Sequence, residues 1–258
     1  MVILCTYMLL QKQIHNFSPK VVDFDGAKFE IKEEWEEEYL ETSYYRIKKT
    51  LELLESNSKD RVLEIGCDSG LFALIFKERF KDISEYQAVE VEQERVKTAL
   101  SRGISVARIN VEKEKLPFGD NYFDVVLFGE VIEHLLDPLL VLSEIKRVIK
   151  STGAVIVSTP NAVGLFARYN HLIGVSPHHP PFLKFRDPQK GQYGVHRFEY
   201  TRGQLKDLLE DNGYKIEEMA FSRFNHQRRG MITKIVERLS LSKPSRSDMM
   251  IFKCRVLK

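Results

Sequence analysis

Residues 61–70 read RVLEIGCDSG, and this stretch decides the fold. The run VLEI within it is short, apolar and β-branched in part, which predicts a strand buried on both faces. The run ends at Gly66, Gly70 follows, and residues 71–80 carry apolar side chains at helical spacing. We therefore expect a strand, a tight glycine turn and a helix in succession. In that geometry, unpaired N–H groups at the start of the helix face a ligand at the turn.

The residue types at the turn restrict the kind of ligand. Glu64 stands at the carboxyl end of the predicted strand, where open α/β sheets bind their ligands. Because Cys67, Asp68 and Ser69 separate the glycines, the G-x-G-x-x-G fingerprint of dinucleotide sites is absent. No Gly-Lys-Ser/Thr sequence of a phosphate-binding loop follows either. An acidic residue ahead of Gly-x-x-x-Gly suits a positively charged ligand better than a pyrophosphate.

Length and composition narrow the class of protein. The 258 residues accommodate one α/β domain with insertions, or two small domains. A hydrophobic share of 43% is typical of a soluble globular chain, and a net charge of +2 predicts no overall attraction to nucleic acid or membrane. Cys5, Cys67 and Cys254 have no zinc spacing and are odd in number, so we expect a reducing, cytoplasmic location without a disulfide framework. Residues 2–10 are apolar but too short to span a bilayer, and they lack the features of a signal peptide, so we expect a β-strand or an apolar tail that packs on the rest of the protein.

The segment before residue 61 predicts a helix. Apolar residues fall on one face of residues 44–55, and the glutamate-rich residues 30–41 run into this pattern. We assign those glutamates to a solvated helix face. The alternative is that the segment forms a lid over a substrate site. The chain is therefore divided into residues 1–55, an N-terminal segment with this helix, and the domain 56–258.

Strands and helices alternate after the glycine turn. Further strands are predicted at residues 86–91, 104–109, 122–128 and 153–160, with helices at 95–102 and 138–150. Short links between them imply a parallel sheet covered on both faces. After an insert at 160–199, a helix at 201–214 and strands at 215–221 and 248–256 complete the pattern. Between the last two strands, residues 222–246 are rich in Lys and Arg. We favour a solvated amphipathic helix there over a seat for an anionic substrate.

Glu90 provides a signal independent of the turn. It ends the second predicted strand, about 20 residues past the glycines, where a carboxylate accepts hydrogen bonds from ribose hydroxyls in nucleoside-binding α/β folds. A surface glutamate is the competing interpretation. The turn and Glu90 together favour a ligand that contains a nucleoside.

The turn resembles the first motif of the class I S-adenosylmethionine-dependent methyltransferases, E/D-x-G-x-G-x-G, except that Asp68 replaces the middle glycine. Residues 116–138, LPFGDNYFDVVLFGEVIEHLLDP, are similar to the broad group of small-molecule, lipid and sugar methyltransferases. The resemblance covers residues 45–257. It implies a Rossmann-like α/β fold: a mostly parallel seven-stranded sheet with helices on both faces and an antiparallel C-terminal hairpin strand.

The resemblance also implies S-adenosyl-L-methionine as cofactor. It implies that the following residues bind the cofactor: Glu64, Gly66, Cys67, Gly70, Glu90, Val91, Asn110, Val111 and Glu130. Asn110 would bond the adenine amino group, which an amide can do because it both donates and accepts. Val111 would pack near the adenine ring.

Two histidines are candidates for the catalytic base. Methyl transfer from a sulfonium is an in-line displacement, and a hydroxyl acceptor loses a proton, so a histidine beside the acceptor is useful. His134 follows the fourth predicted strand, where the family places the acceptor, and His196 ends the insert within GVHRFEYT. The competing interpretation of each is a structural histidine bonded to a backbone carbonyl. We favour His196, because the insert could close over a substrate.

A metal site is the alternative use of the same residues, because Glu130, Glu133 and His134 would share one face of a helical turn. Glu130, Glu133 and His134, followed by the distant His196, are similar to the E-x-x-E-H arrangement of the small-RNA 3′-end ribose 2′-O-methyltransferases, in which these residues bind magnesium or manganese. The same letters occur in metal-free methyltransferases, and the LPF stretch fits those better, so no metal is expected.

Three functions remain open from the sequence. The leading one is an enzyme that methylates a small or medium-sized acceptor, most readily at oxygen: a small molecule, a sugar or a lipid. The second is metal-dependent methylation of RNA ribose, with nucleic acid less favoured as a partner. The third is a module that binds the cofactor without catalysis, which the Asp68 departure leaves open. The sequence does not predict the oligomeric state.

Overall fold

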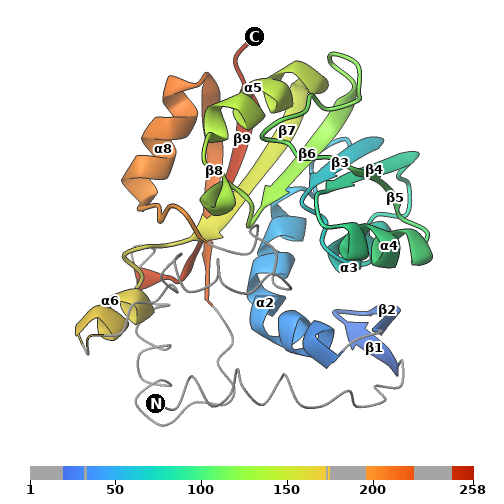
Figure 1. The fold of residues 1–258 in the computed structure, drawn as a ribbon, viewed down its shortest axis with the longest axis horizontal. Helices are drawn as coiled ribbons and strands as arrows, with labels where there is room; N and C mark the ends of the chain where they lie inside the picture. Colours follow the sequence, from blue (N-terminus) through green and yellow to red (C-terminus); the bar gives the residue numbers. More distant parts are fainter. Residues whose placement is uncertain (1–19, 32–33, 173, 175–195, 224–245) are drawn as a thin grey trace.

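The structure is a computed structural model, and it describes residues 20–31, 34–172, 174, 196–223 and 246–258 (Figure 1). The strand or tail expected at residues 2–10, most of the insert and most of the basic segment 222–246 lie outside the described residues. Within the described parts, no helix combines the length and the apolar character that crossing a bilayer requires.

A seven-stranded sheet forms the centre of the molecule (Figure 1). Its strands are β3 (Arg61–Ile65), β4 (Glu85–Glu90), β5 (Ser105–Arg108), β6 (Phe123–Gly129), β7 (Ile149–Pro160), β8 (Tyr214–Ser222) and β9 (Met249–Val256). They follow the order β5-β4-β3-β6-β7-β9-β8, and the first five run parallel to one another. Strand β9 pairs antiparallel with both β7 and β8. The predicted α/β, Rossmann-like sheet with an antiparallel C-terminal hairpin is confirmed.

Helices cover both faces of the sheet. They are α2 (Glu34–Leu53), α3 (Leu71–Arg79), α4 (Gln93–Ser101), α5 (Pro138–Val148), α6 (Leu165–Leu172) and α8 (Arg202–Asp211), with a 3-10 turn η1 (Ile132–His134). One hydrophobic cluster joins the sheet to α5 and α8 through residues such as Ile145 and Leu205. A second cluster joins it to α2 and α3 through residues such as Ile47 and Ile75. Burial of these side chains fixes the helices in place.

Helix ends follow the local sequence signals. The Asp137 side chain accepts a hydrogen bond from the Leu139 backbone N–H at 3.0 Å, which caps α5. Thr201 and Gln204 form a reciprocal capping box at the start of α8. Gly213 follows α8 with φ of +78°, the left-handed conformation that ends many helices. The helix boundaries predicted here are confirmed to within a few residues.

The N-terminal region contains a hairpin that the sequence reading missed. Strands β1 (Lys20–Phe24) and β2 (Ala27–Ile31) pair antiparallel around Asp25 and Gly26, which have φ of +51° and +89°. An Asp-Gly pair with positive φ is a strong hairpin signal, and it was available in the sequence. Residues 30 and 31 therefore belong to a strand, and the helix begins at Glu34 rather than at the start of the glutamate-rich residues 30–41.

Helix α2 also departs from the expected solvated glutamate face. Glu36 is fully buried, and its carboxylate pairs with the Arg102 guanidinium at 2.7 Å. Arg102 also donates to the Ser69 carbonyl at 2.8 Å. The glutamates Glu38 and Glu41 are exposed as expected. The buried pair therefore connects α2, the end of α4 and the glycine turn.

We predict that Arg102→Met lowers the free energy of unfolding by about 3–5 kcal/mol, because Glu36 would remain as a buried carboxylate without its cation. Urea denaturation measures the change. Lys97→Met is the matched control, since Lys97 pairs with Glu94 on the exposed face of α4 and should contribute less than about 1 kcal/mol. Equal losses in the two variants would contradict a structural role for the buried pair.

Candidate active site

A cavity of about 400 Å³ lies at the carboxyl ends of the parallel strands. Its volume is in the range of small-molecule sites. From β3 the chain continues to β4 on one side of the sheet, whereas from β6 it continues to β7 on the other side. The boundary between β3 and β6 is therefore a topological switch point, and open α/β sheets bind their ligands at such a point. Residues after four strands line it: Gly66, Cys67 and Asp68 after β3, Val91 and Glu92 after β4, Asn110 and Val111 after β5, and Glu130, Val131 and His134 after β6.

The glycine turn keeps its expected shape. Gly66 has φ of +77°, and a methyl group added there would stand 2.4 Å from the Val131 side chain. Only glycine fits at that position. Asp68 has φ of +48°, so it adopts the left-handed conformation that the family fills with glycine. Aspartate tolerates this conformation better than most residues, and the departure from the motif therefore leaves the turn intact.

The Glu90 carboxylate faces the cavity and braces the turn. One of its oxygens accepts from the Asp68 backbone N–H at 2.9 Å. The other accepts from the N–H groups of Val91 at 2.7 Å and Glu92 at 3.0 Å. Glu90 therefore connects the end of β4 to the turn after β3, a role that its spacing in the sequence did not predict.

Glu64 lies deeper in the wall. It is 6% exposed, and its carboxylate accepts a hydrogen bond from the Tyr86 hydroxyl at 2.8 Å. Burial raises the pKa of Glu64 to about 8, against the lowering effects of the Tyr86 hydrogen bond and the Arg46 charge. A cationic ligand beside Glu64 would favour its ionised form.

The remaining predicted cofactor residues also border the cavity, apart from one. Asn110 lines it, and its side-chain oxygen accepts from the Glu112 N–H at 3.1 Å. Cys67 is buried in the wall, and burial raises the pKa of its thiol, which stays neutral. Gly70 does not line the cavity; it has φ of +79° at the start of α3, where an added methyl group would press on Ala99 at 3.2 Å.

The residues after β6 do not form the helical turn expected of them. Glu130 has φ of +58°, and the helix that follows is only the 3-10 turn Ile132–His134. The Glu130 carboxylate accepts from the Ser158 hydroxyl at 3.0 Å, which directs it toward β7. Glu130 is therefore not part of the group that Glu133 and His134 form, although it was expected to share a face with them and its charge still acts on Glu133.

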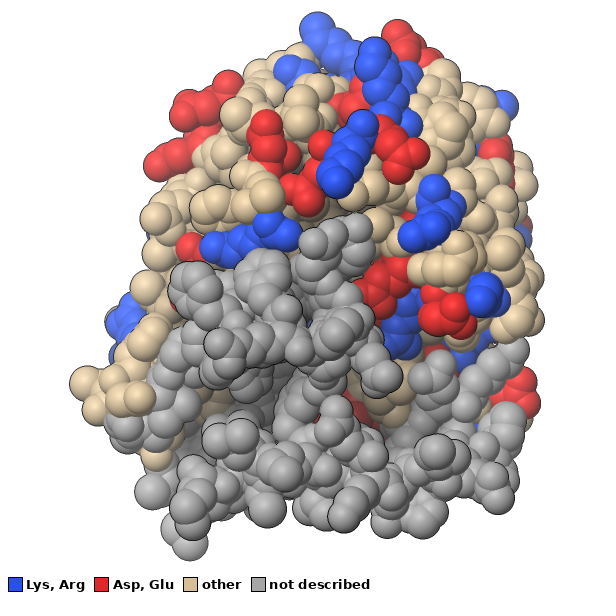
Figure 2. All heavy atoms as spheres, viewed as in Figure 1, with Lys and Arg blue, Asp and Glu red and all other residues tan. Residues whose placement is uncertain are grey.

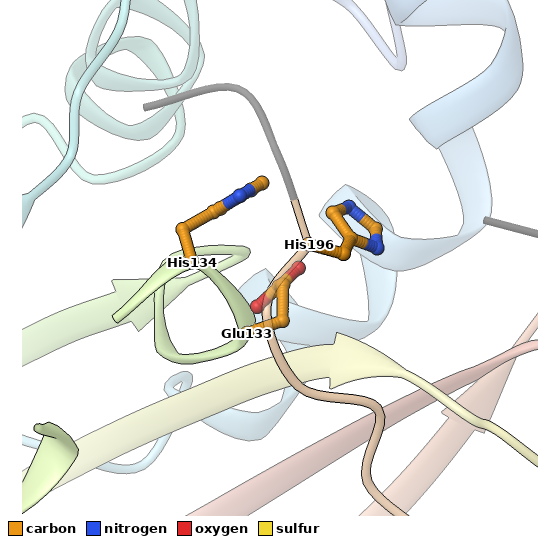
Figure 3. A group of neighbouring side chains, drawn as sticks. All are labelled: Glu133, His134 and His196. Atoms are coloured by element: carbon orange, nitrogen blue, oxygen red, sulfur yellow. The ribbon is translucent and has the colours of Figure 1, made fainter. Parts of the chain in front are cut away.

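Glu133, His134 and His196 do come together (Figure 3). Their ligand atoms all lie within 4.8 Å of one another, and the two imidazole centroids are 4.8 Å apart. His134 projects from the 3-10 turn, whereas His196 projects from the segment that leads to α8 (Figure 3). The backbone N–H of Arg197 donates to the Glu133 carbonyl at 2.7 Å, which fixes this segment beside the turn.

The Glu133 side chain is buried beneath the imidazoles. It is 1% exposed, and one carboxylate oxygen accepts from the Thr159 hydroxyl at 3.0 Å. The other oxygen has no hydrogen-bond partner within the described parts of the chain. Burial and the nearby Glu130 charge raise the pKa of Glu133 well above its ordinary value.

Helix α2 supplies wall residues that sequence reasoning missed. Tyr39 and Arg46 line the cavity, and the Arg46 guanidinium donates to the Tyr39 hydroxyl at 2.7 Å. Trp35 also lines it, with the Arg95 guanidinium 4.3 Å from its ring. These residues precede the recognised motifs. The sequence could have indicated them, because the helical spacing of Trp35, Tyr39 and Arg46 places the three side chains on one face of the helix.

The cavity is acidic overall. Six carboxylates line it, from Glu64, Asp68, Glu90, Glu92, Glu112 and Glu130. Against these stand two guanidinium groups, Arg46 and Arg95, among the described lining residues. The excess of carboxyl groups favours a ligand with a positive group, which would also stabilise the ionised form of Glu64, and disfavours a polyphosphate.

Comparisons with known proteins agree with this geometry. The family model of a methyltransferase domain matches residues 37–219. A probable S-adenosylmethionine-dependent methyltransferase of Mycolicibacterium smegmatis is 28% identical over 157 residues, 61% of this chain and 52% of that protein. A ubiquinone/menaquinone biosynthesis C-methyltransferase of Paraburkholderia phytofirmans is 27% identical over 101 residues, 38% of this chain and 42% of that protein. The chain spans about half the length of these curated relatives.

The fold comparison points the same way. A chain in the solved complex between the Haloferax volcanii Trm112 methyltransferase activator and a putative methyltransferase superposes with a TM-score of 0.60 at 16% identity. The match covers 86% of this chain and 92% of that one. Because the family model matches most of the chain, the chain belongs to the methyltransferase domain family, and its fold is that of the solved methyltransferase chain.

Proposed function

We propose that the chain is a class I S-adenosylmethionine-dependent methyltransferase, which transfers the methyl group to an oxygen of a small or medium-sized acceptor: a small molecule, a sugar or a lipid. One observation carries the proposal. His134 lines the cavity, and the His196 imidazole stands 4.8 Å from it, centroid to centroid. A hydroxyl acceptor must lose a proton as the carbon–oxygen bond forms, and an imidazole beside it can take that proton.

The cofactor is proposed to occupy the part of the cavity along β3, β4 and β5. Its ribose would lie at Glu90, its adenine near Val91, Asn110 and Val111, and its methionine portion near Gly66. A carboxylate offers about four lone-pair positions, and three of those on Glu90 already accept backbone N–H groups. One position remains for a ribose hydroxyl, in a geometry that the turn has already fixed.

The N-terminal segment 1–55 is proposed to cover the cofactor and acceptor from the side of α2. The support comes from Trp35, Tyr39 and Arg46, which face the cavity from that helix. Ile47 and Leu51 on the same helix are buried in the core, so α2 acts as a fixed wall. The second part of the division, residues 56–258, would carry the cofactor turn and the two histidines.

Replacing Glu90 tests the cofactor placement. Glu90→Ala should raise the dissociation constant of S-adenosylmethionine about 10–100-fold, because it removes a charged acceptor and frees the turn. Glu90→Gln keeps one acceptor oxygen and should weaken binding less. Titration calorimetry measures both. Glu94→Gln, at an exposed site on α4, is the control and should bind as the native protein does; native affinity in Glu90→Ala would refute the placement.

Replacing the two histidines tests the proposed chemistry. Incubation with methyl-labelled S-adenosylmethionine and fractionated small molecules, sugars and lipids should yield a product whose label is an O-methyl group by NMR. On that acceptor, His134→Ala or His196→Ala should lower turnover about 10²–10⁴-fold and leave cofactor affinity unchanged.

His171→Ala is the control for these variants, since His171 is exposed on α6. It should retain full turnover. A labelled product carrying N-methyl or C-methyl would contradict the oxygen acceptor. Native turnover in both His134→Ala and His196→Ala, with a lowered melting temperature, would instead assign the pair a structural role.

A second candidate function is metal-dependent methylation of RNA ribose. The observation that favours it is the group Glu133, His134 and His196, in which a buried Glu133 oxygen that has no hydrogen-bond partner among the described residues lies beside two imidazoles. One carboxylate and two imidazoles suit a divalent transition metal. On the face drawn in Figure 2, however, basic and acidic side chains are mixed over the described residues, so the described part of that face offers no continuous basic surface for a phosphate backbone.

Metal binding can be measured without an acceptor. For the proposed function, titration of the protein with Mn²⁺ should show no saturable site, and chelator should leave turnover unchanged. The second candidate requires the reverse: a site lost in Glu133→Gln and in His196→Ala, a melting temperature raised by Mn²⁺, and RNA binding that weakens steeply with salt. His171→Ala again provides the control, since it lies outside the group.

A further inference from the structure

Strand β8 ends at a cation that the site described above does not use. Arg223 directly follows β8 and is partly buried. Its Nη2 group donates to the hydroxyl of Tyr45 on α2 at 2.7 Å, and its guanidinium carbon lies 4.5 Å from the centre of the Tyr45 ring. Among the described residues, no carboxylate oxygen lies within 4.0 Å of this guanidinium. Arg223 therefore has no direct counter-ion in the described part of the chain.

Other cations of the β8–β9 hairpin do have acidic partners. Lys253 of β9 pairs with Glu218 at 2.9 Å, and Arg255 of β9 pairs with Glu217 at 3.0 Å. Both glutamates belong to β8, the strand that Arg223 follows. The hairpin thus neutralises these two cations along its length and leaves the cation at the end of β8 without an acid.

The guanidinium of Arg223 has donors to spare. It carries five N–H groups, and the Tyr45 hydroxyl accepts one of them. The Nε group is buried without a hydrogen-bond partner, and Nη1 makes no hydrogen bond within the described residues but is reached by solvent. Arginine keeps its charge in proteins, so Arg223 cannot reduce the cost of burial by becoming neutral. A carboxylate or a phosphate would supply the missing charge and accept parallel hydrogen bonds from the fork.

The pairing of the strands places Arg223 at the edge of the sheet where the cavity lies. Strands β7 and β8 both pair antiparallel with β9, so they run parallel to each other and their carboxyl ends share one edge. Thr159 of β7 and Phe221 of β8 both pair with Met250, which separates them by two strand spacings, roughly 10 Å. Arg223 follows two residues after Phe221.

Thr159 and α2 connect this position to the proposed acceptor site. The Thr159 hydroxyl donates to the carboxylate of Glu133, which groups with the two histidines. On α2, Tyr45 is the neighbour of Arg46, which lines the cavity. The ring of Tyr45 also packs edge-on against that of Tyr44, at 5.3 Å between centroids, which limits its movement. The guanidinium is therefore held on the order of 10 Å from the histidines, within the length of a medium-sized molecule.

We propose that Arg223, positioned by Tyr45, binds an anionic group of the acceptor, either a carboxylate or a phosphate. The proposal rests on the proposed function, in which the acceptor hydroxyl lies beside His134 and His196. It narrows the acceptor to a molecule that carries an acidic group roughly 10 Å from the hydroxyl that receives the methyl group. A neutral sugar or a neutral lipid would leave Arg223 without its counter-ion.

Two simple anions test the site without an acceptor. S-adenosylhomocysteine at saturating concentration fills the cofactor site, and inorganic phosphate or acetate is then titrated while NMR follows the amide signals of the protein. At least one of the anions should bind saturably to the native protein, with a dissociation constant on the order of millimolar. Arg223→Met should weaken this binding about 10–100-fold, the range for hydrogen bonds between charged groups. The preferred anion distinguishes a phosphate from a carboxylate.

Two further variants separate a direct contact from a structural effect. Arg255→Met is the matched control, since it removes an arginine of the same hairpin that already has a glutamate partner, and it should bind the anion as the native protein does. Tyr45→Phe retains the ring and Arg223 but removes the hydroxyl that positions the guanidinium. It should weaken anion binding about 2–10-fold. This variant keeps the test open if Arg223→Met does not fold.

The acceptor itself provides the second measurement. The product labelled by methyl transfer should be retained on an anion exchanger. On that acceptor, Arg223→Met should raise KM about 10–100-fold and leave kcat within about threefold, because the contact lies away from the reacting oxygen. Arg255→Met should leave both constants unchanged.

Three results overturn the proposal while leaving oxygen methylation intact: no saturable binding of either anion to the native protein, equal anion binding in Arg223→Met, or a labelled product without an acidic group. A native KM in Arg223→Met overturns it as well. Failure of the proposed function is distinguishable from these results. It would appear as anion binding that depends on Arg223 together with no O-methyl product from any fraction, which removes the acceptor role and leaves only an anion site.

Discussion

The carboxylate of Glu90 is the constraint on which the turn after β3 and the cavity wall beside it depend. A turn after a parallel strand has several N–H groups without partners in the sheet, and these must be satisfied. Here the Glu90 side chain accepts one from Asp68 in the turn after β3, and two from Val91 and Glu92 after β4. The Gly66 N–H donates to the Val89 carbonyl at 2.8 Å. The end of β4 therefore shapes the turn after β3, and the cavity wall is formed before any ligand arrives.

The N-terminal helix is tied to the same turn by arginine. Arg102 donates to the Ser69 carbonyl and pairs with the buried Glu36 of α2. A buried pair of this kind adds little net stability, but it permits one arrangement of the two elements. Because the Glu36 pair fixes α2 relative to the turn, it also fixes Tyr39 and Arg46 at the cavity. The positions of Tyr39 and Arg46 in the cavity wall therefore depend on the Glu36–Arg102 pair, which lies outside that wall.

Periodic patterns predicted the sheet and most of its helices, since a buried strand or an amphipathic helix requires apolar residues at a regular spacing along the chain. Glu90 and the turn after β3 were predicted because their spacing along the chain is set by one strand, one turn and one helix. The burial of Glu36 was not predicted, because its partner Arg102 is distant in sequence and a charge run is usually solvated. The β1–β2 hairpin was not predicted, although the Asp25-Gly26 pair is a sequence pattern typical of a hairpin turn.

The residues after β6 show a second reason why the sequence did not predict the whole site. Helical spacing placed Glu130 with Glu133 and His134, but that argument requires a regular helix. The left-handed backbone of Glu130 breaks the pattern. The contact between His134 and His196 was expected only through a family resemblance, since no local rule brings residues from two such distant segments together.

The switch point between β3 and β6 explains how one cavity can serve two ligands. In the proposed arrangement the cofactor lies along β3, β4 and β5, and the acceptor lies beside the histidines that follow β6 and precede α8. The methyl group must cross between them in line, so side chains cannot intrude at the boundary. Gly66 and Gly129 stand at the ends of the two strands, and a methyl group on either would press against a neighbour, at 2.4 Å from Val131 and 3.1 Å from the Ser158 hydroxyl. The strand order thus separates the ligands, and the two glycines leave the boundary between them unobstructed.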